Sequence, residues 1–221
     1  MIAIEKETEP RELLEYRSKP DAEYDGPEFT PIKDRLRKAL LREQGFLCAY
    51  CMTRIEDREN HTKIEHWKCQ SGFPELGLDY GNLLASCKGN EGRRFSEQHC
   101  DTRKGNRDLK FNPARPAHRI EEHVHYLSSG RIESDDPEFD LQLNQVLNLN
   151  HVRLIANRLE VFKAVLAARK KLDKQGRYTA RQLQITLEKW RDRPDNRAVP
   201  YCGVAISVLR KALRKLNAID G

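Results

Sequence analysis

Apolar residues recur at helical spacing between residues 30 and 45. Four of them fall on one face of a helix: Ile32, Leu36, Leu40 and Leu41. Pro31 suits the first turn of such a helix, and Thr30 before it can cap the free backbone amides. Gly45 favours its end. The pattern therefore predicts an amphipathic helix over residues 31–44, which carries the chain to the first cysteines.

Two short segments that look like strands follow, at residues 62–67 and 82–87. The loop between them, CQSGFPELGLDYG, is rich in Gly, Pro and polar residues, which favour turns. Both segments are therefore predicted to be strands, and a short helix is predicted near residues 101–110. Strand, strand and helix in this order would form a ββα unit.

The chain after residue 150 is predicted to be helical. Apolar side chains recur there at steps of four, three and four residues, at Ile155, Leu159, Phe162 and Leu166. This spacing is typical of an amphipathic helix that contacts a core. Further helices are predicted at about residues 179–191 and 203–217. The apolar stripes are interpreted as core rather than as a cofactor site.

Composition narrows the class of protein. The 221 residues are 38% hydrophobic and 33% charged, which describes a polar chain that can still bury a core. No apolar run is long enough to span a bilayer, so no membrane contact is expected. The segment MIAIEKETEP lacks the features of a secretory signal, and a cytoplasmic protein is therefore expected.

Positive charge is concentrated in residues 151–221, which hold 17 Lys and Arg residues and only six Asp and Glu residues. A basic helical region of this kind suits the phosphate backbone of a nucleic acid or an acidic partner surface. Well-solvated helix faces are the alternative, and charge alone does not separate these interpretations.

Four of the six cysteines have the spacing of metal ligands. Cys48 and Cys51 form a Cys-x-x-Cys pair, and Cys87 and Cys100 follow along the chain. In a reducing cytoplasm this tight spacing favours a metal over disulfides. A tetrahedral four-cysteine set without an open position is typical of structural zinc, so one tightly bound zinc ion is predicted. His99 is an alternative fourth ligand.

The other cysteines and most histidines have no motif support. Cys69 and Cys202 lack a partner at ligand spacing and are interpreted as buried or free thiols. Five histidines are interpreted as surface or structural residues: His61, His118, His123, His125 and His151.

The segment KIEHW places an acidic residue beside a histidine between the two cysteine pairs. An imidazole with an ordinary pKa of about 6.5 can take a proton from water at neutral pH, so His66 is the predicted general base. A hard cation such as Mg²⁺ or Mn²⁺ prefers carboxylate oxygens, and Asp101 and Glu65 are its predicted ligands. Successive strand side chains point to opposite faces, so Glu65 can join His66 at one metal only if the strand ends or bends there. Asp101 is accordingly the safer ligand.

Basic residues follow Asp101 directly. If Asp101 opens the predicted helix, backbone amides, Arg103 and Lys104 would point toward the same phosphate. Arg103 and Lys104 are therefore candidate nucleic-acid contacts.

The order of these residues resembles the HNH, or ββα-metal, nuclease motif. In this chain the motif would consist of Glu65 and His66, then Asn82, then Asp101. The final position is usually His or Asn in that motif, so Asp101 is a departure that still supplies an oxygen ligand. The resemblance implies that Asn82 braces the hairpin by hydrogen-bonding loop backbone.

The similarity extends to the segments EQGFLCAYCM, KIEHWKCQS, LDYGNLLASCKGNEG and QHCDTRKGN. Followed by a basic helical C-terminus, they resemble the HNH endonuclease family found in retron operons and in the Septu anti-phage defence system. The resemblance is specific over residues 30–113 and looser elsewhere. It implies a nuclease subunit that acts with an SMC-like or ABC-like ATPase, in some operons beside a reverse transcriptase and its small DNA–RNA product.

The predicted fold class is α+β, with a zinc-stabilised ββα-metal (HNH) core over residues 31–115. An N-terminal arm over 1–30 precedes it, and a mainly α-helical basic region over 116–221 would contact a partner or nucleic acid. The predicted function is a metal-dependent HNH endonuclease, a phosphodiester hydrolase for which DNA is favoured over RNA. The rival is a catalytically inactive, zinc-stabilised nucleic-acid-binding or scaffold module, which the departure at Asp101 supports.

Overall fold

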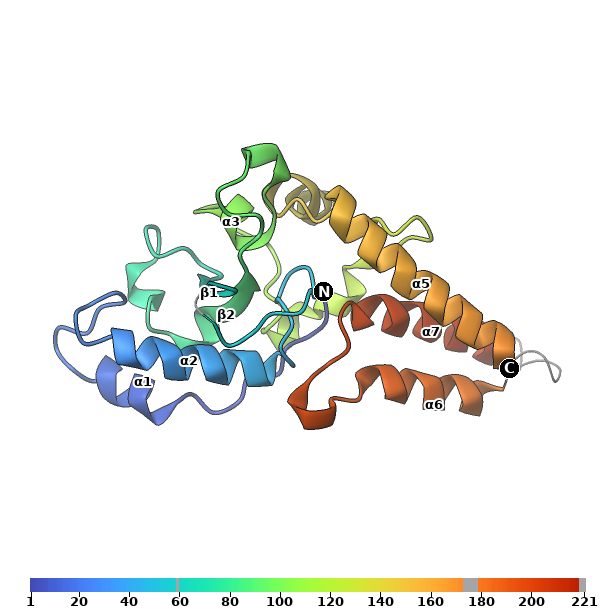
Figure 1. Ribbon diagram of the computed structural model, residues 1–221, viewed down its shortest axis with the longest axis horizontal. Coiled ribbons are helices and arrows are strands. Elements are labelled where there is room, and N and C mark those ends of the chain that lie inside the picture. The colour runs from blue at the N-terminus through green and yellow to red at the C-terminus, as the bar shows by residue number, and fades with distance from the viewer. Residues whose placement is uncertain (59, 173–178, 219–221) are drawn as a thin grey trace.

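The protein is a mostly helical α+β chain with two small antiparallel sheets (Figure 1). The computed structural model describes residues 1–58, 60–172 and 179–218. Its helices and strands are α1 (Arg11–Arg17), α2 (Thr30–Glu43), β1 (Thr62–His66), β2 (Leu83–Cys87), α3 (Cys100–Lys104), β3 (His125–Tyr126), β4 (Ile132–Glu133), α4 (Pro137–Leu141), α5 (Val152–Leu172), α6 (Ala180–Arg191) and α7 (Cys202–Asn217). Short 3₁₀ turns occur at Pro74–Leu76, Tyr80–Asn82, Phe95–Glu97, Pro116–His118, Ile120–Glu122 and Pro194–Asn196, and a π turn occurs at Gln142–Val146.

Helix α2 confirms the first predicted helix. It buries Leu36, Leu40 and Leu41 completely, because these side chains share the face that packs on the hairpin. The prediction was wrong about its cap, since Thr30 is the first helical residue and no side chain caps the amides. Just beyond the helix, the Gln44 amide bonds both backbone groups of Ala85, at 2.7 and 2.8 Å, and so fastens α2 to strand β2.

Strands β1 and β2 confirm the two predicted strands and pair antiparallel, with Thr62 opposite Cys87 and His66 opposite Leu83. Helix α3 is shorter than the predicted helix over 101–110. Gly105 follows it with a positive φ of 55°, a backbone conformation that glycine adopts readily and that ends the helix. The hairpin and α3 together bring the motif residues to one region of the fold.

The three predicted C-terminal helices are confirmed as α5, α6 and α7. Helix α7 contacts both others and lies between them on the right of Figure 1. The prediction was wrong about which face of α5 is buried. Leu166, which was assigned to the buried face, is 42% exposed, whereas Leu154 and Val165 are buried. The buried face also contains Arg158, whose guanidinium donates to the carbonyls of Gly130 and Leu149 at 2.7 Å each. Arg158 therefore shares the buried face of α5 with Leu154 and Val165, so the apolar residues alone do not define that face.

The C-terminal helices pack onto the first cysteine turn. The amide of Tyr201 donates to the carbonyl of Met52 (3.1 Å), and that of Ala198 donates to Gly45 (3.0 Å). Buried apolar residues form one cluster that extends from the N-terminal segment to α7. The N-terminal arm, the predicted nuclease core and the basic helical region therefore share buried surface.

No helix in the described ranges is both long enough and apolar enough to cross a lipid bilayer.

Candidate active site

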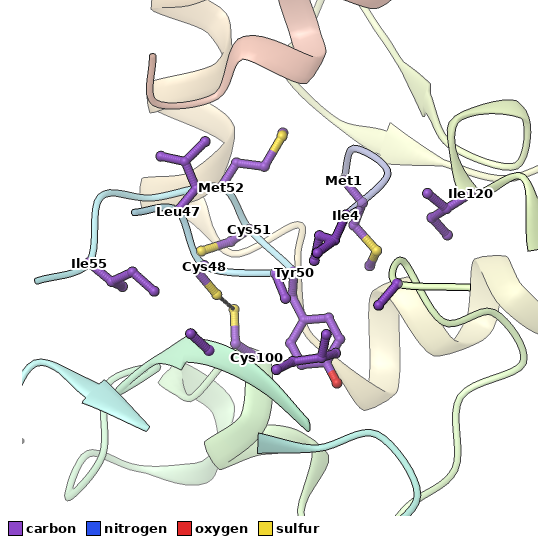
Figure 2. Packing of buried hydrophobic residues seen from close by; sticks show 14 of the residues in the cluster. Met1, Ile4, Leu47, Cys48, Tyr50, Cys51, Met52, Ile55, Cys100 and Ile120 are labelled. Carbon is purple, nitrogen blue, oxygen red and sulfur yellow. Dashed lines mark hydrogen bonds between the residues drawn. The ribbon is translucent and has the colours of Figure 1, made fainter. Parts of the chain in front are cut away.

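The four predicted zinc ligands lie together in the core. The Sγ atoms of Cys48, Cys51, Cys87 and Cys100 are buried and all within 4.8 Å of one another. The Cys48–Cys100 and Cys51–Cys87 sulfur pairs are each separated by 3.8 Å. A tetrahedral zinc with Zn–S bonds of about 2.3 Å requires sulfur–sulfur distances of about 3.8 Å, so the donor set fits structural zinc. Figure 2 shows Cys48 and Cys100 pointing toward each other from separate segments.

The first half of this cluster is a tight turn. The amide of Met52 donates to the carbonyl of Cys48 (3.0 Å), and the amide of Cys48 donates to Thr53 (2.9 Å). Met52 closes the turn with a left-handed φ of 63°. The amide of Ala49 donates to Ala85 (3.0 Å), so the turn is also fixed to strand β2.

The second half joins the end of β2 to the start of α3. Between them, Gly89 has a φ of 50° and lies against the backbone of His99. A Cβ at position 89 would lie 1.9 Å from the His99 carbonyl oxygen, so only glycine allows this approach. The amide of Cys100 donates to Leu147 (2.9 Å), which also ties α3 to the π turn.

The remaining candidate ligands lie at or outside the edge of the cluster. His99 Nδ1 lies 3.2 Å from Cys100 Sγ and 4.0 Å from Cys87 Sγ, beside the sulfur set. Cys69 and Cys202 are buried free thiols that do not belong to the set.

The Glu65 carboxylate is buried, with 3% of the residue exposed. Its Oε1 atom accepts a hydrogen bond from Tyr50 Oη (2.7 Å) and an ion-pair contact from Lys104 Nζ (2.9 Å). Burial raises the pKa of Glu65 well above its usual range, and the neighbouring Asp101 raises it further, while Lys104 opposes both effects. Because Tyr50 lies between Cys48 and Cys51, the cysteine turn directly holds this carboxylate.

Asp101 is the more accessible carboxylate, with 19% of its side chain exposed. It lies beside Glu65 and contacts Lys63 Nζ at 3.3 Å. It also lines a cavity of about 430 Å³ between α2 and β1, where Lys33 and Arg37 of α2 and Lys88 after β2 contribute positive charge. A charged ligand could therefore reach Asp101 from solvent.

His66, the last residue of β1, has one ring nitrogen occupied. Its Nε2 lies 2.9 Å from the carbonyl of Gly77, which can only accept, so Nε2 carries the proton. In the neutral ring Nδ1 then keeps a free lone pair, and no described residue donates to it. Burial lowers the pKa of His66, which favours this neutral form. The edge of Tyr24, from the N-terminal arm, packs against the ring at 4.4 Å between centroids.

Asn82, directly before β2, bonds the backbone near the start and in the middle of the loop between the strands. Its Oδ1 accepts from the amide of Lys68 (2.8 Å), and its Nδ2 donates to the carbonyls of Lys68 (3.0 Å) and Leu76 (3.1 Å). These bonds shape the segment that carries Gly77 to His66.

The two basic candidates after Asp101 have intramolecular partners. Lys104 is buried, and its Nζ donates to the carbonyl of His66 (2.9 Å) besides contacting Glu65. Arg103 lies over the ring of Phe95, with Cζ 3.6 Å from the ring centroid, and donates to the Phe95 carbonyl. Lys104 is therefore placed to hold the carboxylate, whereas Arg103 lies on the surface.

Three contacts of this region were missed from the sequence: those of Tyr50, Lys104 and Tyr24 with Glu65 or His66. The contact of Tyr50 could have been predicted from its position inside the CAYC turn, because the two flanking cysteines fix the direction of a side chain between them. Tyr24 gave no signal, because its contact depends on how the N-terminal arm folds back. Within the described part of the chain, none of the five histidines without motif support contacts Glu65 or Asp101, and each has another partner. His118 Nδ1 accepts from the Asn112 amide, His151 Nδ1 accepts from the Arg153 amide, and His123 stacks on Phe111. His125 and His61 contact the carboxylates of Asp135 and Glu56.

No protein-family model matches the chain. It is 24% identical over 162 residues to the Septu protein PtuB of Bacillus thuringiensis, a match that covers 70% of this chain and 59% of that protein. It is 31% identical over 124 residues to a protein of Escherichia coli named "Retron Ec83 putative HNH endonuclease", covering 50% of this chain and 48% of that protein. The chain thus spans about half to three fifths of the length of these relatives.

These matches make the chain a distant homologue of defence-system proteins, one of which carries the name "putative HNH endonuclease". The particular relatives are the Septu protein PtuB and the retron Ec83 protein, and the expected resemblance to the Septu and retron proteins is thereby confirmed.

The four-cysteine cluster predicts one zinc per chain and a fold that depends on it. Cys100→Ser should lose zinc and unfold at a much lower temperature, because structural zinc binding contributes roughly 10 kcal/mol or more in apparent terms. The control is Cys69→Ser, which changes a buried thiol beside Ser71 outside the cluster. Elemental analysis and thermal unfolding measure both effects. A Cys100→Ser protein that keeps wild-type stability would contradict the assignment.

Proposed function

We propose that the chain is a metal-dependent HNH endonuclease that hydrolyses phosphodiester bonds of nucleic acid. The observation that carries this proposal is that the carboxylates of Glu65 and Asp101 lie beside each other. Lys63 contacts Asp101, and Lys104 contacts Glu65. His66, which keeps a free ring nitrogen, directly follows Glu65 in the sequence. Distant homology to the protein named "Retron Ec83 putative HNH endonuclease" supports the same reaction class. DNA is the favoured substrate, and RNA is the alternative.

The two carboxylates fit a hard divalent cation. They lie close enough for Asp101 to raise the pKa of Glu65, and like charges brought together in this way favour a bound cation. Glu65 and Asp101 would hold Mg²⁺ or Mn²⁺, both of which prefer oxygen ligands. Such an ion supplies stabilisation of the negative charge that develops on the leaving oxygen.

His66 is assigned the role of general base. The Gly77 carbonyl fixes the tautomer, so Nδ1 can take a proton from the attacking water. The water oxygen then forms a bond to phosphorus, and the bond from phosphorus to the leaving oxygen breaks. Tyr24 lies against the imidazole ring and limits its rotation.

Basic side chains around the cavity would orient the substrate. Lys63 Nζ contacts both Asp101 (3.3 Å) and Glu91 (2.7 Å), so it lies between the candidate centre and the loop that follows β2. Lys33, Arg37 and Lys88 line the same cavity. Phosphate groups of a nucleic acid would replace or join the carboxylates that now pair with these cations.

We also propose that the chain is the effector subunit of a bacterial anti-phage defence system of the Septu or retron type. In this role it would act with an SMC-like or ABC-like ATPase, beside a reverse transcriptase and its DNA–RNA product in some operons. The support is homology to the Septu protein PtuB and the retron Ec83 protein, together with the basic region over 151–221. Its exposed cations include Lys170 and Lys171 at the end of α5.

An inactive nucleic-acid-binding or scaffold module remains the second candidate. The observation that favours it is the burial of His66, of which 7% is exposed, beneath Tyr24. Under this alternative zinc would stabilise the same fold, but no hydrolysis would occur.

Replacement of His66 separates the two candidates. His66→Ala should abolish Mg²⁺- or Mn²⁺-dependent cleavage, because general-base catalysis contributes about 10²- to 10⁴-fold to rate. Zinc content should remain unchanged, since His66 is not part of the cysteine cluster. The assay uses supercoiled plasmid, single-stranded DNA and bulk RNA, with the protein alone and with an ATPase from the same operon.

His61→Ala is the matched control, because this half-exposed histidine contacts the Glu56 carboxylate and, within the described residues, neither Glu65 nor Asp101. Equal cleavage by wild type and His66→Ala would refute the general base. A folded, zinc-loaded wild type that cuts nothing, with or without the ATPase, would favour the inactive module.

Tyr50 is predicted to position the metal-binding carboxylate. Tyr50→Phe should keep zinc but raise the Mg²⁺ concentration for half-maximal cleavage about tenfold, because it removes a hydrogen bond to a charged group. Tyr80→Phe is the matched control, since it removes an equivalent 2.7 Å bond to Glu43, which is not a candidate ligand. If both variants change the Mg²⁺ dependence equally, Tyr50 has only a structural role.

A further inference from the structure

Phe95 is an exposed aromatic residue at a protruding loop. The loop joins β2 to α3 and projects above α3 at the top of Figure 1. Phe95 is 59% exposed and is the one aromatic among the large apolar side chains that lie exposed in the described ranges. A single exposed apolar side chain is common on protein surfaces, so the neighbours of Phe95 decide whether it belongs to a binding surface.

Phe95 lies near four arginines, and its loop also contains the acidic residues Glu91 and Glu97. Arg93 and Arg94 lie in the loop, Arg103 lies in α3, and Arg107 follows α3. Within the described residues none of these four forms an ion pair with a carboxylate. Arg103 and Arg107 donate instead to backbone carbonyls, including that of Gln145 at 3.3 Å. Their positive charge therefore remains available to an external anion.

One face of the Phe95 ring is already covered by a cation. The Arg103 guanidinium lies over it at 3.6 Å and also donates to the Phe95 carbonyl. This contact holds the ring in place while much of it stays exposed. The arrangement matches the stacking platforms on which proteins bind unpaired bases.

The loop is held rigidly from both sides. Asn90 Nδ2 donates to the carbonyl of Glu97 (2.8 Å), and Gln98 Nε2 donates to that of Arg93 (2.9 Å). Asn148 Nδ2 donates to the carbonyl of Gln98 (2.8 Å), which anchors the loop to the segment before α5. A surface fixed before binding loses little conformational entropy when a ligand arrives.

The loop also starts beside the candidate active site. Glu91 and Asp101 contact the same Lys63 ammonium group, and Phe95 lies only four residues after Glu91. Four residues span at most about 14 Å, so the backbone of Phe95 lies within about that distance of the backbone of Glu91.

We propose that Phe95, with Arg93, Arg94, Arg103 and Arg107, forms a binding surface for single-stranded nucleic acid beside the candidate active site. An unpaired base would stack on the open face of Phe95, and the arginines would contact the flanking phosphates. A base inside a duplex is stacked on its neighbours and has no free face for this contact. The inference names the substrate class of the proposed nuclease and rests on that proposed function for its role.

The test measures binding without cleavage. Full-length protein carrying His66→Ala, without added Mg²⁺ or Mn²⁺, is titrated into fluorescent oligothymidine and oligouridine of about 20 nucleotides, longer than typical single-strand sites. A DNA duplex of the same length serves as the third ligand, and fluorescence anisotropy reports the affinity. The DNA and RNA arms show which type of strand the surface prefers.

Phe95→Ala should weaken single-strand binding about tenfold, a typical effect of losing one stacking contact, and leave duplex binding within about twofold. Phe95→Tyr should restore the affinity, because it keeps an aromatic face. Arg94→Gln should weaken both single-strand and duplex binding and lower the salt dependence by about one ion. Leu14→Ala is the control, since it removes a similarly exposed apolar side chain from α1; it should change neither affinity, and zinc content should stay constant throughout.

The proposal is overturned if wild-type affinity for single strands does not exceed that for the duplex. It is also overturned if Phe95→Ala leaves single-strand binding unchanged. If that variant instead loses binding to a protein partner, Phe95 belongs to a protein interface and the proposal is wrong. The binding test requires no hydrolysis, so the two proposals can fail separately. If wild-type protein does not cleave but Phe95→Ala weakens single-strand binding, the proposed nuclease is refuted and the binding surface is retained. If wild-type protein cleaves but Phe95→Ala leaves single-strand binding unchanged, the binding surface is refuted and the proposed nuclease is retained.

Discussion

The four-cysteine cluster is the constraint on which the rest of the arrangement depends. It joins a turn at Cys48 and Cys51 to Cys87 at the end of β2 and Cys100 at the start of α3, which are distant along the sequence. The sheet beneath it has only two short strands, and a two-stranded hairpin is marginally stable by itself. Zinc bound by these thiolates would supply roughly 10 kcal/mol or more to hold the three segments together.

The same cluster places the candidate catalytic groups. Asp101 directly follows Cys100, and Tyr50, between Cys48 and Cys51, bonds the Glu65 carboxylate. Lys104 closes the arrangement by contacting both Glu65 and the backbone of His66. The structural metal site and the candidate active site are therefore adjacent parts of one network, and α7 covers its other side through Met52.

Local patterns predicted most elements but not their tertiary contacts. Strands β1 and β2 and helices α2, α5, α6 and α7 follow from hydrophobic periodicity, and the cysteine cluster follows from ligand spacing. The end of α3 at Gly105 and the buried face around Arg158 were missed, because a glycine with positive φ and buried carbonyls decide them. The contacts of Tyr24 with His66 and of Lys104 with Glu65 join distant segments, so no local pattern announced them.

The central claim is that Glu65 and Asp101 form a site for a divalent cation apart from the zinc cluster. The most direct test is calorimetric titration of Mn²⁺ into zinc-loaded protein, with Asp101→Ala and Glu91→Ala compared. The account predicts one Mn²⁺ site in the wild type, its loss in Asp101→Ala, and its retention in Glu91→Ala, whose carboxylate contacts Lys63 but not Glu65. Mn²⁺ binding that persists unchanged in Asp101→Ala would contradict the account.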